Sequence, residues 1–366
     1  MKVTGFDVYG FRLPLTGRLV LRDATLTDRE GLLLRLSGED GLSGWGEVSP
    51  LPGFSPETLP EAAVGLRSLA ASLVGRNVTG EWMGADGDLA RLLDGMEILP
   101  SVRFGLELAA WNLYGASTGA SLPALISPGH RPTVPVNGLL AGSPDEVLEG
   151  ARRMRDAGYV AVKLKVGGRP VSEDVALVRA VAEALGGDVA LRLDANRAWS
   201  LDEALGFARG IEGQEIEYLE EPLADPAGLE EFALKGGVKV ALDESLVGME
   251  PESLAEHPYA GAVVLKPSLL GGLSRTLRLA ERAVGLGMRP VVSSAYETGV
   301  GTAALVALAA GIGTGEIPAG LDTYRRLAGD VIEPRLPLPA PRLRVREAVS
   351  WNGIVRDRLS PEAGPE

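Results

Sequence analysis

The sequence of 366 residues has no cysteine and only two histidines, His130 and His257. Without cysteine the chain cannot form disulfide bonds, thiolate metal sites or thiol nucleophiles. His130 lies in a PGHRP turn and His257 at the expected end of a helix, so neither stands at the end of a predicted strand. We therefore exclude a catalytic dyad based on histidine and expect both side chains at the surface.

Blocks rich in lysine and arginine are also missing, and the net charge at pH 7 is −13. These features argue against a nucleic-acid partner and against binding to an anionic membrane. No GxGxxG motif follows a predicted strand, no P-loop is present, and the Ser, His and Asp residues occur in no plausible catalytic order. Each absence narrows the chemistry that the chain can perform.

Apolar runs of membrane-spanning length are absent as well. The uncharged stretch 298–315 has an apolar centre, AALVALAA, that is far shorter than the roughly 20 residues of a membrane span, so we expect a buried helix there. The first residues lack the apolar core and small-residue cleavage site of a signal peptide. We expect a cytoplasmic protein, and the sequence leaves open whether it is a monomer or a homo-oligomer.

The chain divides into parts that differ in the spacing of their apolar and polar residues. At the start of residues 1–120, apolar and polar residues alternate with a period of two on both sides of a GED-G turn, which is typical of antiparallel strands. The rest of this part has helical spacing of its apolar residues. We expect these residues to form an α+β domain. Residues 125–325 alternate strand-like and helical runs, and the proline-rich residues 326–366 are predicted to pack back on the first domain.

Strand-like runs separated by helical ones favour a (β/α)-barrel over an open sheet. The helical run after the first strand opens with the Ser-x-x-Glu pattern of a capping box and ends at Gly158. The expected strands are residues 134–140, 161–166, 189–195, 217–222, 239–244, 261–266, 288–294 and 319–323.

Charged residues stand at the ends of five successive strand-like runs, at intervals of about one strand plus one helix. Strands that are buried on both faces carry few charges, so a charge repeated at the same end needs a functional reason. In a parallel barrel this end is the mouth, where active sites lie. The charged residues are Lys163, Lys165, Asp194, Glu220, Asp243 and Lys266.

Three of these residues are acids: Asp194, Glu220 and Asp243. Carboxylates on neighbouring strands, without cysteine or a suitable histidine, predict a site for Mg²⁺ or Mn²⁺ rather than Zn²⁺. Any one acid could instead cap the following helix, but three at matched positions favour the metal site. Strand alternation selects Glu220 over Glu221 and leaves Glu221 facing the helices or the rim. We prefer Asp243 to its neighbour Glu244.

The lysines are candidate acid–base groups. A lysine works as a general base only when its pKa falls toward neutrality, and a neighbouring ammonium group, a divalent cation and partial burial all lower it. Lys163 and Lys165 share one strand face, and Lys266 is expected on the opposite side of the mouth. A Lys-x-Lys pair on a solvated edge strand is the alternative, but this pair interrupts an apolar run.

The motifs KLK (163–165), LDAN (193–196), EEP (220–222), DES (243–245) and LKP (265–267) resemble those of the enolase superfamily over essentially the whole chain. The resemblance implies an α/β fold, a (β/α)₇β modified TIM barrel with an N-terminal α+β capping domain. It implies that the three acids bind Mg²⁺, and that a proton α to a carboxylate is removed to give an enediolate stabilised by the metal. Lysines on two opposed strands resemble the muconate-lactonising subgroup.

The segments 20–36, 44–58, 100–109 and 319–324 resemble members of this subgroup that dehydrate 2-succinyl-6-hydroxy-2,4-cyclohexadiene-1-carboxylate to 2-succinylbenzoate in menaquinone biosynthesis. This resemblance implies a hydro-lyase that acts on a small-molecule carboxylate.

It implies the roles of the lysines too. Lys165 would remove the α-proton and then protonate the departing hydroxyl in a syn elimination. Lys266 would stabilise the anion from the other face of the ring, and Lys163 would tune Lys165 and hold a carboxylate oxygen.

The same resemblance implies the substrate contacts. Loops around Arg22 and residues 53–54 would close over the substrate and exclude water. The residues expected to line the pocket are Arg192, Asn196, Ser293, Ser294, Glu297 and Gly320.

Other reactions could use the same residues: racemisation of an N-acyl amino acid, epimerisation of a dipeptide, or cycloisomerisation of muconate. Racemisation needs a lysine on each face of the substrate, so the catalytic residues do not decide between them. A dipeptide epimerase would carry Asp-x-Asp in the last strand, where this chain reads GLDTY. A non-catalytic barrel that serves as a binding module would be expected to lack an acid or a lysine, and none is missing.

Overall fold

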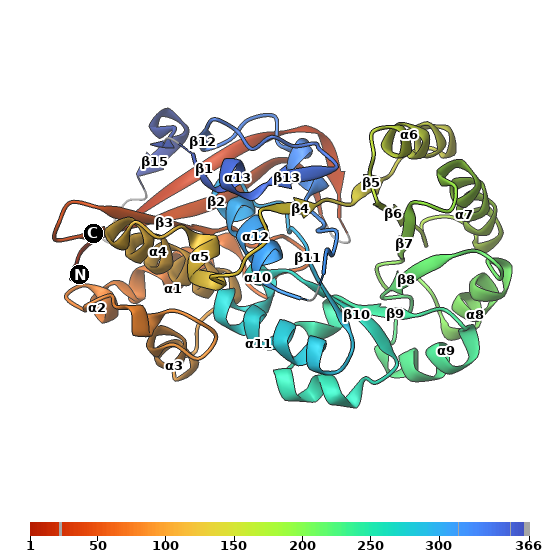
Figure 1. The fold of residues 1–366 in the computed structure, drawn as a ribbon, viewed down its shortest axis with the longest axis horizontal. Coiled ribbons are helices and arrows are strands. Elements are labelled where there is room, and N and C mark those ends of the chain that lie inside the picture. Colours follow the sequence, from red (N-terminus) through yellow and green to blue (C-terminus); the bar gives the residue numbers. More distant parts are fainter. Residues whose placement is uncertain (22–23, 314, 352, 362–366) are drawn as a thin grey trace.

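The structure is a computed structural model that describes residues 1–21, 24–313, 315–351 and 353–361. Figure 1 shows an antiparallel sheet with its helices on the left and a curled sheet of parallel strands on the right. The predicted α/β class and the barrel with an N-terminal α+β unit are confirmed.

The N-terminal unit is built on a four-stranded sheet, in which the C-terminal strand β15 (Leu359–Pro361) lies beside β1, followed by β2 and β3. Its long pair β1 (Val3–Val20) and β2 (Thr25–Gly38) gives the period-two pattern seen in the sequence. Strand β3 (Ser43–Val48) packs closely against helix α4. The approach requires glycine at position 46, because a Cβ there would lie 1.8 Å from the carbonyl oxygen of Gly105. The helices of this unit are α1 (Leu59–Ser68), α2 (Ala70–Leu73), α3 (Asp88–Asp94), α4 (Pro100–Thr118) and α5 (Leu122–Ile126).

The barrel contains seven hydrogen-bonded parallel strands in sequence order. The predicted first strand is split into β4 (Thr133–Pro135) and β5 (Gly138–Leu140). The predicted eighth strand is not a regular strand: Ala319 and Gly320 form single parallel bridges to Val136 and Ser293, which close the barrel. The remaining strands are β6 (Ala161–Lys165), β7 (Ala190–Asp194), β8 (Ile216–Glu220), β9 (Val240–Leu242), β10 (Ala260–Leu265) and β11 (Arg289–Val292).

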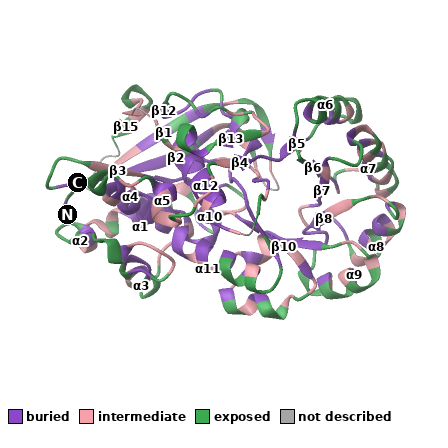
Figure 2. Cartoon of the chain, viewed as in Figure 1, coloured by how far each residue is buried: buried purple, intermediate pink, exposed green. Residues whose placement is uncertain are grey.

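Helices cover the outside of these strands (Figure 1). The predicted capping box of α6 is present, since the Ser143 hydroxyl accepts from the Glu146 backbone and the Glu146 carboxylate accepts from the Ser143 backbone. The uncharged stretch forms α12, which is buried along nearly its whole length, as expected (Figure 2). The helices are α6 (Pro144–Asp156), α7 (Val171–Leu185), α8 (Leu201–Gly210), α9 (Leu229–Gly236), α10 (Pro267–Leu270), α11 (Gly272–Gly285) and α12 (Gly299–Gly311).

The C-terminal residues join both units. Strand β13 (Arg342–Arg344) pairs with β4 at the start of the barrel, whereas β15 (Leu359–Pro361) pairs with β1. Between them lie α13 (Val345–Val349) and β14 (Gly353–Ile354), and β14 pairs with β12 (Ile332–Glu333), which precedes β13 in the chain. We propose the domain division predicted from the sequence, with limits near residues 120 and 326.

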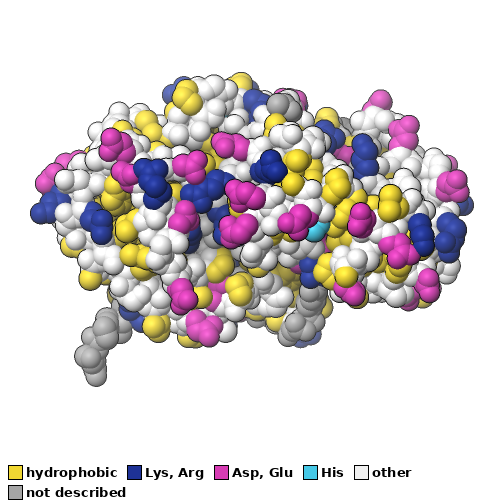
Figure 3. All heavy atoms as spheres, turned by 90° about the horizontal axis from the view of Figure 1, so that it is seen from below, with side chains coloured by type: hydrophobic (Ala, Val, Ile, Leu, Met, Phe, Trp, Pro, Cys, Tyr) yellow, Lys and Arg dark blue, Asp and Glu magenta, His cyan; other side chains and the backbone are white. Residues whose placement is uncertain are grey.

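Within the described part of the chain, no helix is long and apolar enough to cross a membrane. The face shown in Figure 3 carries acidic and basic side chains interspersed with uncharged ones.

Candidate active site

Strand register brings the predicted charged residues together at one end of the barrel. In the parallel ladder Lys165 is paired with Asp194, and Asp194 with Glu220. Asp243 directly follows β9, and Lys266 directly follows β10. All of these positions lie at the carboxyl ends of neighbouring strands, as expected for a site at the mouth.

The three acids are almost inaccessible to solvent, and lysines contact each of them. The amino group of Lys163 lies 2.8 Å from Asp194 Oδ2 and 3.2 Å from Glu220 Oε1. Lys165 Nζ lies 3.3 Å from the same oxygen of Asp194. Lys266 donates a hydrogen bond to Asp243 Oδ2. Two ammonium groups therefore share one carboxylate oxygen, and a third binds the acid on the far strand.

Burial and charge act against each other in this cluster. Burial, together with repulsion from Asp194, raises the pKa of Glu220 well above its ordinary value. Burial alone would raise the pKa of Asp194 as well, but attraction to Lys163 and Lys165 lowers it. Burial would lower the pKa of Lys163, but Asp194 and Glu220 raise it well above its ordinary value. Lys163 therefore remains an ammonium group between these two acids.

The acids do not form a ready cage for an ion. Among the residues that the structure describes, no three aspartate, glutamate or histidine side chains are arranged to hold a metal ion. The amino groups of Lys163 and Lys266 lie against the acids instead. The assignment of these acids as metal ligands therefore stays a prediction. Their suitability for an ion has to be judged from the type of donor atom that they supply.

Glu221 has a role that sequence reasoning missed. The sequence predicts that it faces the helices or the rim, and the structure shows in addition that it is buried, with a positive φ of 40°. Its carboxylate accepts hydrogen bonds from the backbone nitrogens of Asp243 (2.9 Å) and Ser245 (2.7 Å) and forms a 3.0 Å ion pair with Arg197. The second acid of the EEP motif thus holds the chain on which Asp243 is presented.

A cleft lies above the strand ends, between the barrel and the N-terminal unit. Its cavity of about 60 Å³ is far smaller than the roughly 300–1,000 Å³ of ordinary ligand pockets, so a substrate requires the covering loops to move. The N-terminal unit contributes Leu21, Leu51 and Phe54, and the Phe54 ring centroid lies 5.9 Å from Lys266 Nζ. The predicted contact Arg22 lies outside the described residues.

The predicted substrate-binding residues separate into two groups. Asn196, Ser293, Ser294 and Gly320 line the cleft. Asn196 follows β7 in a left-handed conformation, with φ of 44°, and its side-chain oxygen accepts from Lys165. The Ser294 hydroxyl is already committed, because it donates to Glu297 at 2.7 Å.

Arg192 and Glu297 do not reach the cleft. The Arg192 side chain is fully buried inside the barrel, where it donates to Glu217 and to Asn137 Oδ1. Glu297 is buried at the start of α12, where its carboxylate accepts from Ser268 (2.7 Å) and from the backbone of Ala295 (2.7 Å). We did not predict three polar residues that do line the cleft: Asn137, Asp322 and Thr323.

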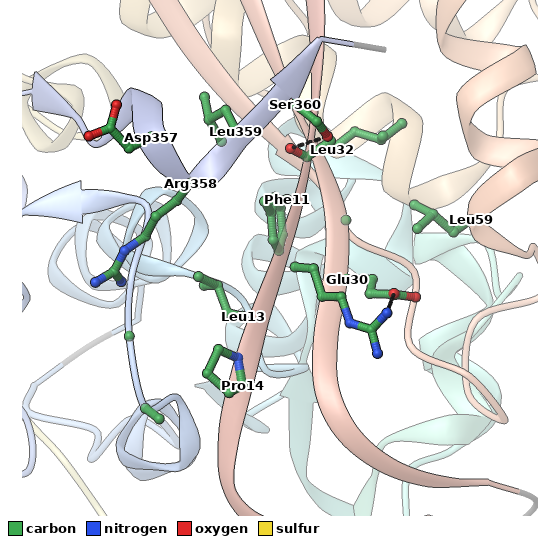
Figure 4. Close-up of a pocket in the computed structure, with 15 residues that line it drawn as sticks. Phe11, Leu13, Pro14, Glu30, Leu32, Leu59, Asp357, Arg358, Leu359 and Ser360 are labelled. Atoms are coloured by element: carbon green, nitrogen blue, oxygen red, sulfur yellow. Dashed lines mark hydrogen bonds and ion pairs between the residues drawn. The ribbon is translucent and has the colours of Figure 1, made fainter. Parts of the chain in front are cut away.

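A wider groove, of about 780 Å³, lies on the outside of the N-terminal sheet between β1, β2 and β15 (Figure 4). It contains none of the predicted site residues, and its charged side chains include Arg12, which pairs with Asp28 (3.0 Å) and Glu30 (3.5 Å). We assign the chemistry to the smaller cleft because it holds the lysines and Asp194.

Comparisons with known proteins agree with the two-part architecture. Residues 146–349 match the family described as "Enolase C-terminal domain-like", and residues 3–113 match the family "MenC, N-terminal domain". The o-succinylbenzoate synthase of Haemophilus influenzae is 36% identical over 88% of this chain and 91% of its own length. That of Yersinia pseudotuberculosis is 34% identical over 94% of this chain and 98% of its own length.

Solved structures show the same fold at lower identity. The muconate lactonizing enzyme from Pseudomonas fluorescens, in complex with muconolactone, has a TM-score of 0.87 at 24% identity, and 98% of both chains is covered. The dipeptide epimerase from Enterococcus faecalis, in complex with Mg and L-Leu-L-Tyr, has a TM-score of 0.85 at 23% identity, covering 95% of this chain and 98% of the epimerase.

Proposed function

Because the chain belongs to the enolase superfamily and, within it, to the o-succinylbenzoate synthase family, we propose that it dehydrates 2-succinyl-6-hydroxy-2,4-cyclohexadiene-1-carboxylate to 2-succinylbenzoate. The product is an intermediate of menaquinone biosynthesis. One observation carries the proposal: curated o-succinylbenzoate synthases are 34–36% identical over most of both chains, with an N-terminal domain of the matching family.

Members of the superfamily use a divalent metal, and we propose that Asp194, Glu220 and Asp243 hold Mg²⁺ or Mn²⁺ here. The donor set fits such an ion: three buried carboxylates supply only oxygen atoms, and crowding of negative charge contributes to the raised pKa of Glu220. When bound, the ion would offset the negative charge that develops on the substrate carboxylate.

Lys165 is proposed as the acid–base group. Its side chain is 43% exposed, whereas those of Lys163 and Lys266 are 13% and 12% exposed, so Lys165 is the lysine most open to a substrate. It would take the proton from C1, α to the carboxylate, to leave an enediolate. It would then return that proton to the C6 hydroxyl as the C–O bond breaks, so that water leaves and the ring becomes aromatic.

Lys266 and Lys163 are proposed to act by charge. Burial would lower the pKa of Lys266, but attraction to Asp243 and Glu220 raises it, so this side chain remains an ammonium group. A fixed positive charge on the face of the ring opposite Lys165 would stabilise the enediolate. Phe54 covers this side of the cleft and would exclude water from it.

The alternative reactions use the same residues. An N-succinyl amino acid racemase, dipeptide epimerases and muconate lactonizing enzymes share the fold, but at 22–24% identity these solved structures support the fold alone. Among the described residues that line the cleft, none favours one of these activities over dehydration.

The proposed function is tested by mixing the protein with the cyclohexadiene carboxylate and Mg²⁺ and following the loss of diene absorbance. Turnover that EDTA abolishes and added Mg²⁺ restores is the expected result. No turnover, together with racemisation of N-succinyl amino acids, would reject the proposal. Turnover that persists in EDTA would reject the metal-dependent part only.

A further inference from the structure

The cleft has a polar wall on the side of the barrel away from the acids. Ala319 and Gly320 close the barrel between β11 and the β4–β5 segment, and three strands separate them from β8 in either direction around the ring. Glu220 stands at the end of β8, so this wall is diametrically opposite the central acid of the cluster. Asn137, Asp322 and Thr323 line it.

Two side-chain atoms on this wall have no hydrogen-bond partner. Thr323 Oγ1 and Asp322 Oδ1 are both buried and unpaired. A buried polar atom without a partner costs free energy, so two adjacent ones in a cleft indicate that a ligand supplies the missing contacts.

The other candidates on this side are already engaged or badly placed. The Ser294 hydroxyl donates to Glu297, and Asn137 Oδ1 accepts from Arg192 at 2.8 Å. The Ser293 hydroxyl reaches only the carbonyl oxygen of Gly320, at 3.4 Å. Thr323 is therefore the hydroxyl on this wall that is free to donate to a ligand.

The charge on this wall is balanced. Asp322 Oδ2 accepts from the backbone nitrogen of Leu139 at 2.9 Å and lies 3.3 Å from Arg325 Nε. Burial is the larger effect and raises the pKa of Asp322, whereas the ion pair with Arg325 offsets the carboxylate charge and acts in the opposite direction on the pKa. An anionic group can thus approach Thr323 without meeting an unbalanced negative charge.

The proposed substrate is long enough to need this wall. Its ring carboxylate belongs at the acid cluster and its ring lies between Lys165 and Lys266, so the four-carbon succinyl arm extends away from the acids. Resting on the proposed function, we infer that Thr323 is a specificity-determining residue whose hydroxyl donates a hydrogen bond to an oxygen of the terminal carboxylate of that arm. Asp322 positions Thr323 by tying its segment to β5, and a water molecule between Asp322 Oδ1 and the arm would satisfy the remaining atom.

Calorimetric binding of two aromatic acids tests this inference. 2-Succinylbenzoate carries the terminal carboxylate, and 2-butanoylbenzoate has an acyl chain of the same length without it. Wild-type protein is expected to prefer the succinyl compound. Thr323→Val, which replaces the hydroxyl with a methyl group, should weaken 2-succinylbenzoate binding about 10- to 100-fold and leave 2-butanoylbenzoate unchanged, while Thr323→Ser restores the preference.

Steady-state kinetics distinguishes a loss of substrate binding from a general disturbance of the structure. Thr323→Val should raise KM about tenfold or more with kcat within about threefold of wild type, because the residue does not touch the reacting atoms. Equal weakening of both ligands, no weakening of either, or a wild type that does not discriminate between them would overturn the inference. If wild-type protein turns over the diene and Thr323→Val is unaffected, the inference fails and the proposed function stands. A wild type without turnover rejects the proposed function itself.

Discussion

The three lysines of the cleft are chemically identical but differ in what surrounds them. Lys163 and Lys266 are buried against acids, whereas Lys165 is the one with a substantially exposed side chain. Exposure matters here because a general base must meet the substrate, while a buried ammonium group acts at a distance through its charge.

Replacement of Lys165 by alanine should therefore remove catalysis without unfolding the protein. We expect Lys165→Ala to lower kcat by at least about 10³-fold, with a melting temperature close to that of wild type, because a half-exposed lysine contributes little to packing. Steady-state kinetics and thermal denaturation measure the two effects. Lys235→Ala, at an exposed ion pair on α9, is the matched control and should keep full activity. Substantial residual turnover in Lys165→Ala would exclude its role as the base.

Glu221 lies outside the cleft but holds the backbone from which the proposed metal ligand Asp243 extends. Its carboxylate holds the backbone at Asp243 and Ser245 and pairs with Arg197. Glu221→Gln removes this ion pair and should therefore make the position of the Asp243 carboxylate less fixed. We expect the affinity for Mg²⁺ to fall about 10- to 100-fold, as found for partners of metal ligands elsewhere. Titration of activity with Mg²⁺ gives the value. An unchanged Mg²⁺ requirement would show that Glu221 only supports the fold.

The sequence was enough to place the acids and lysines at one end of the barrel but not to identify every residue that lines the cleft. Charges at the ends of apolar runs stand out because buried strands rarely carry them. Arg192 has the same side-chain direction as Asp194, but it lies two residues lower on β7, about 6.6 Å along the strand, and so points into the barrel rather than the cleft. The depth of a residue within a barrel depends on the register between strands, which the chain alone does not reveal.

At the scale of elements, an ion cluster ties three strands together at the amino end of the barrel. Glu217 on β8 binds Arg192 on β7 at 2.7 Å and also pairs with Arg289 on β11. Burial would raise the pKa of Glu217, but Arg192 and then Arg289 lower it below its ordinary value. Since the folded protein holds the proton less tightly than the unfolded chain, the cluster stabilises the fold above the ordinary pKa and loses this effect as the pH falls through the lowered one.

Glu217→Gln should reveal this dependence. Near pH 7 we expect its unfolding free energy to be about 3 kcal/mol below that of wild type, because the buried guanidinium of Arg192 loses its charge partner. The difference should stay constant down to about pH 4.5 and shrink below it. Urea denaturation at several pH values measures it. A difference that grows as the pH falls would contradict the assignment.

Elements with strong periodicity could be predicted, and irregular ones could not. The helices and central strands follow from their apolar spacing and from the Ser-x-x-Glu pattern that caps α6. The last expected strand instead makes single bridges at Ala319 and Gly320 and then turns into a 3₁₀ helix at Asp322–Arg326. That turn brings Asp322 and Thr323 to the cleft, and no apolar pattern marks it.

At the scale of the whole molecule, the N-terminal unit and the barrel meet at buried charged side chains, one acidic and one basic. Glu47 on β3 accepts hydrogen bonds from the backbones of Thr298 and Gly301 at the start of α12. Arg29 on β2 is fully buried and donates to the carbonyl oxygen of Tyr296 at 3.1 Å. Tyr296 lines the cleft, so the docking of the two units also shapes the substrate site.

We propose that this shared site is specialised for dehydration rather than racemisation. The most direct test is the ratio of kcat/KM for 2-succinyl-6-hydroxy-2,4-cyclohexadiene-1-carboxylate to kcat/KM for an N-succinyl amino acid, measured on the same preparation with saturating Mg²⁺. We predict a ratio above about 100 in favour of dehydration. A ratio near one, or a preference for the amino acid, would contradict the account.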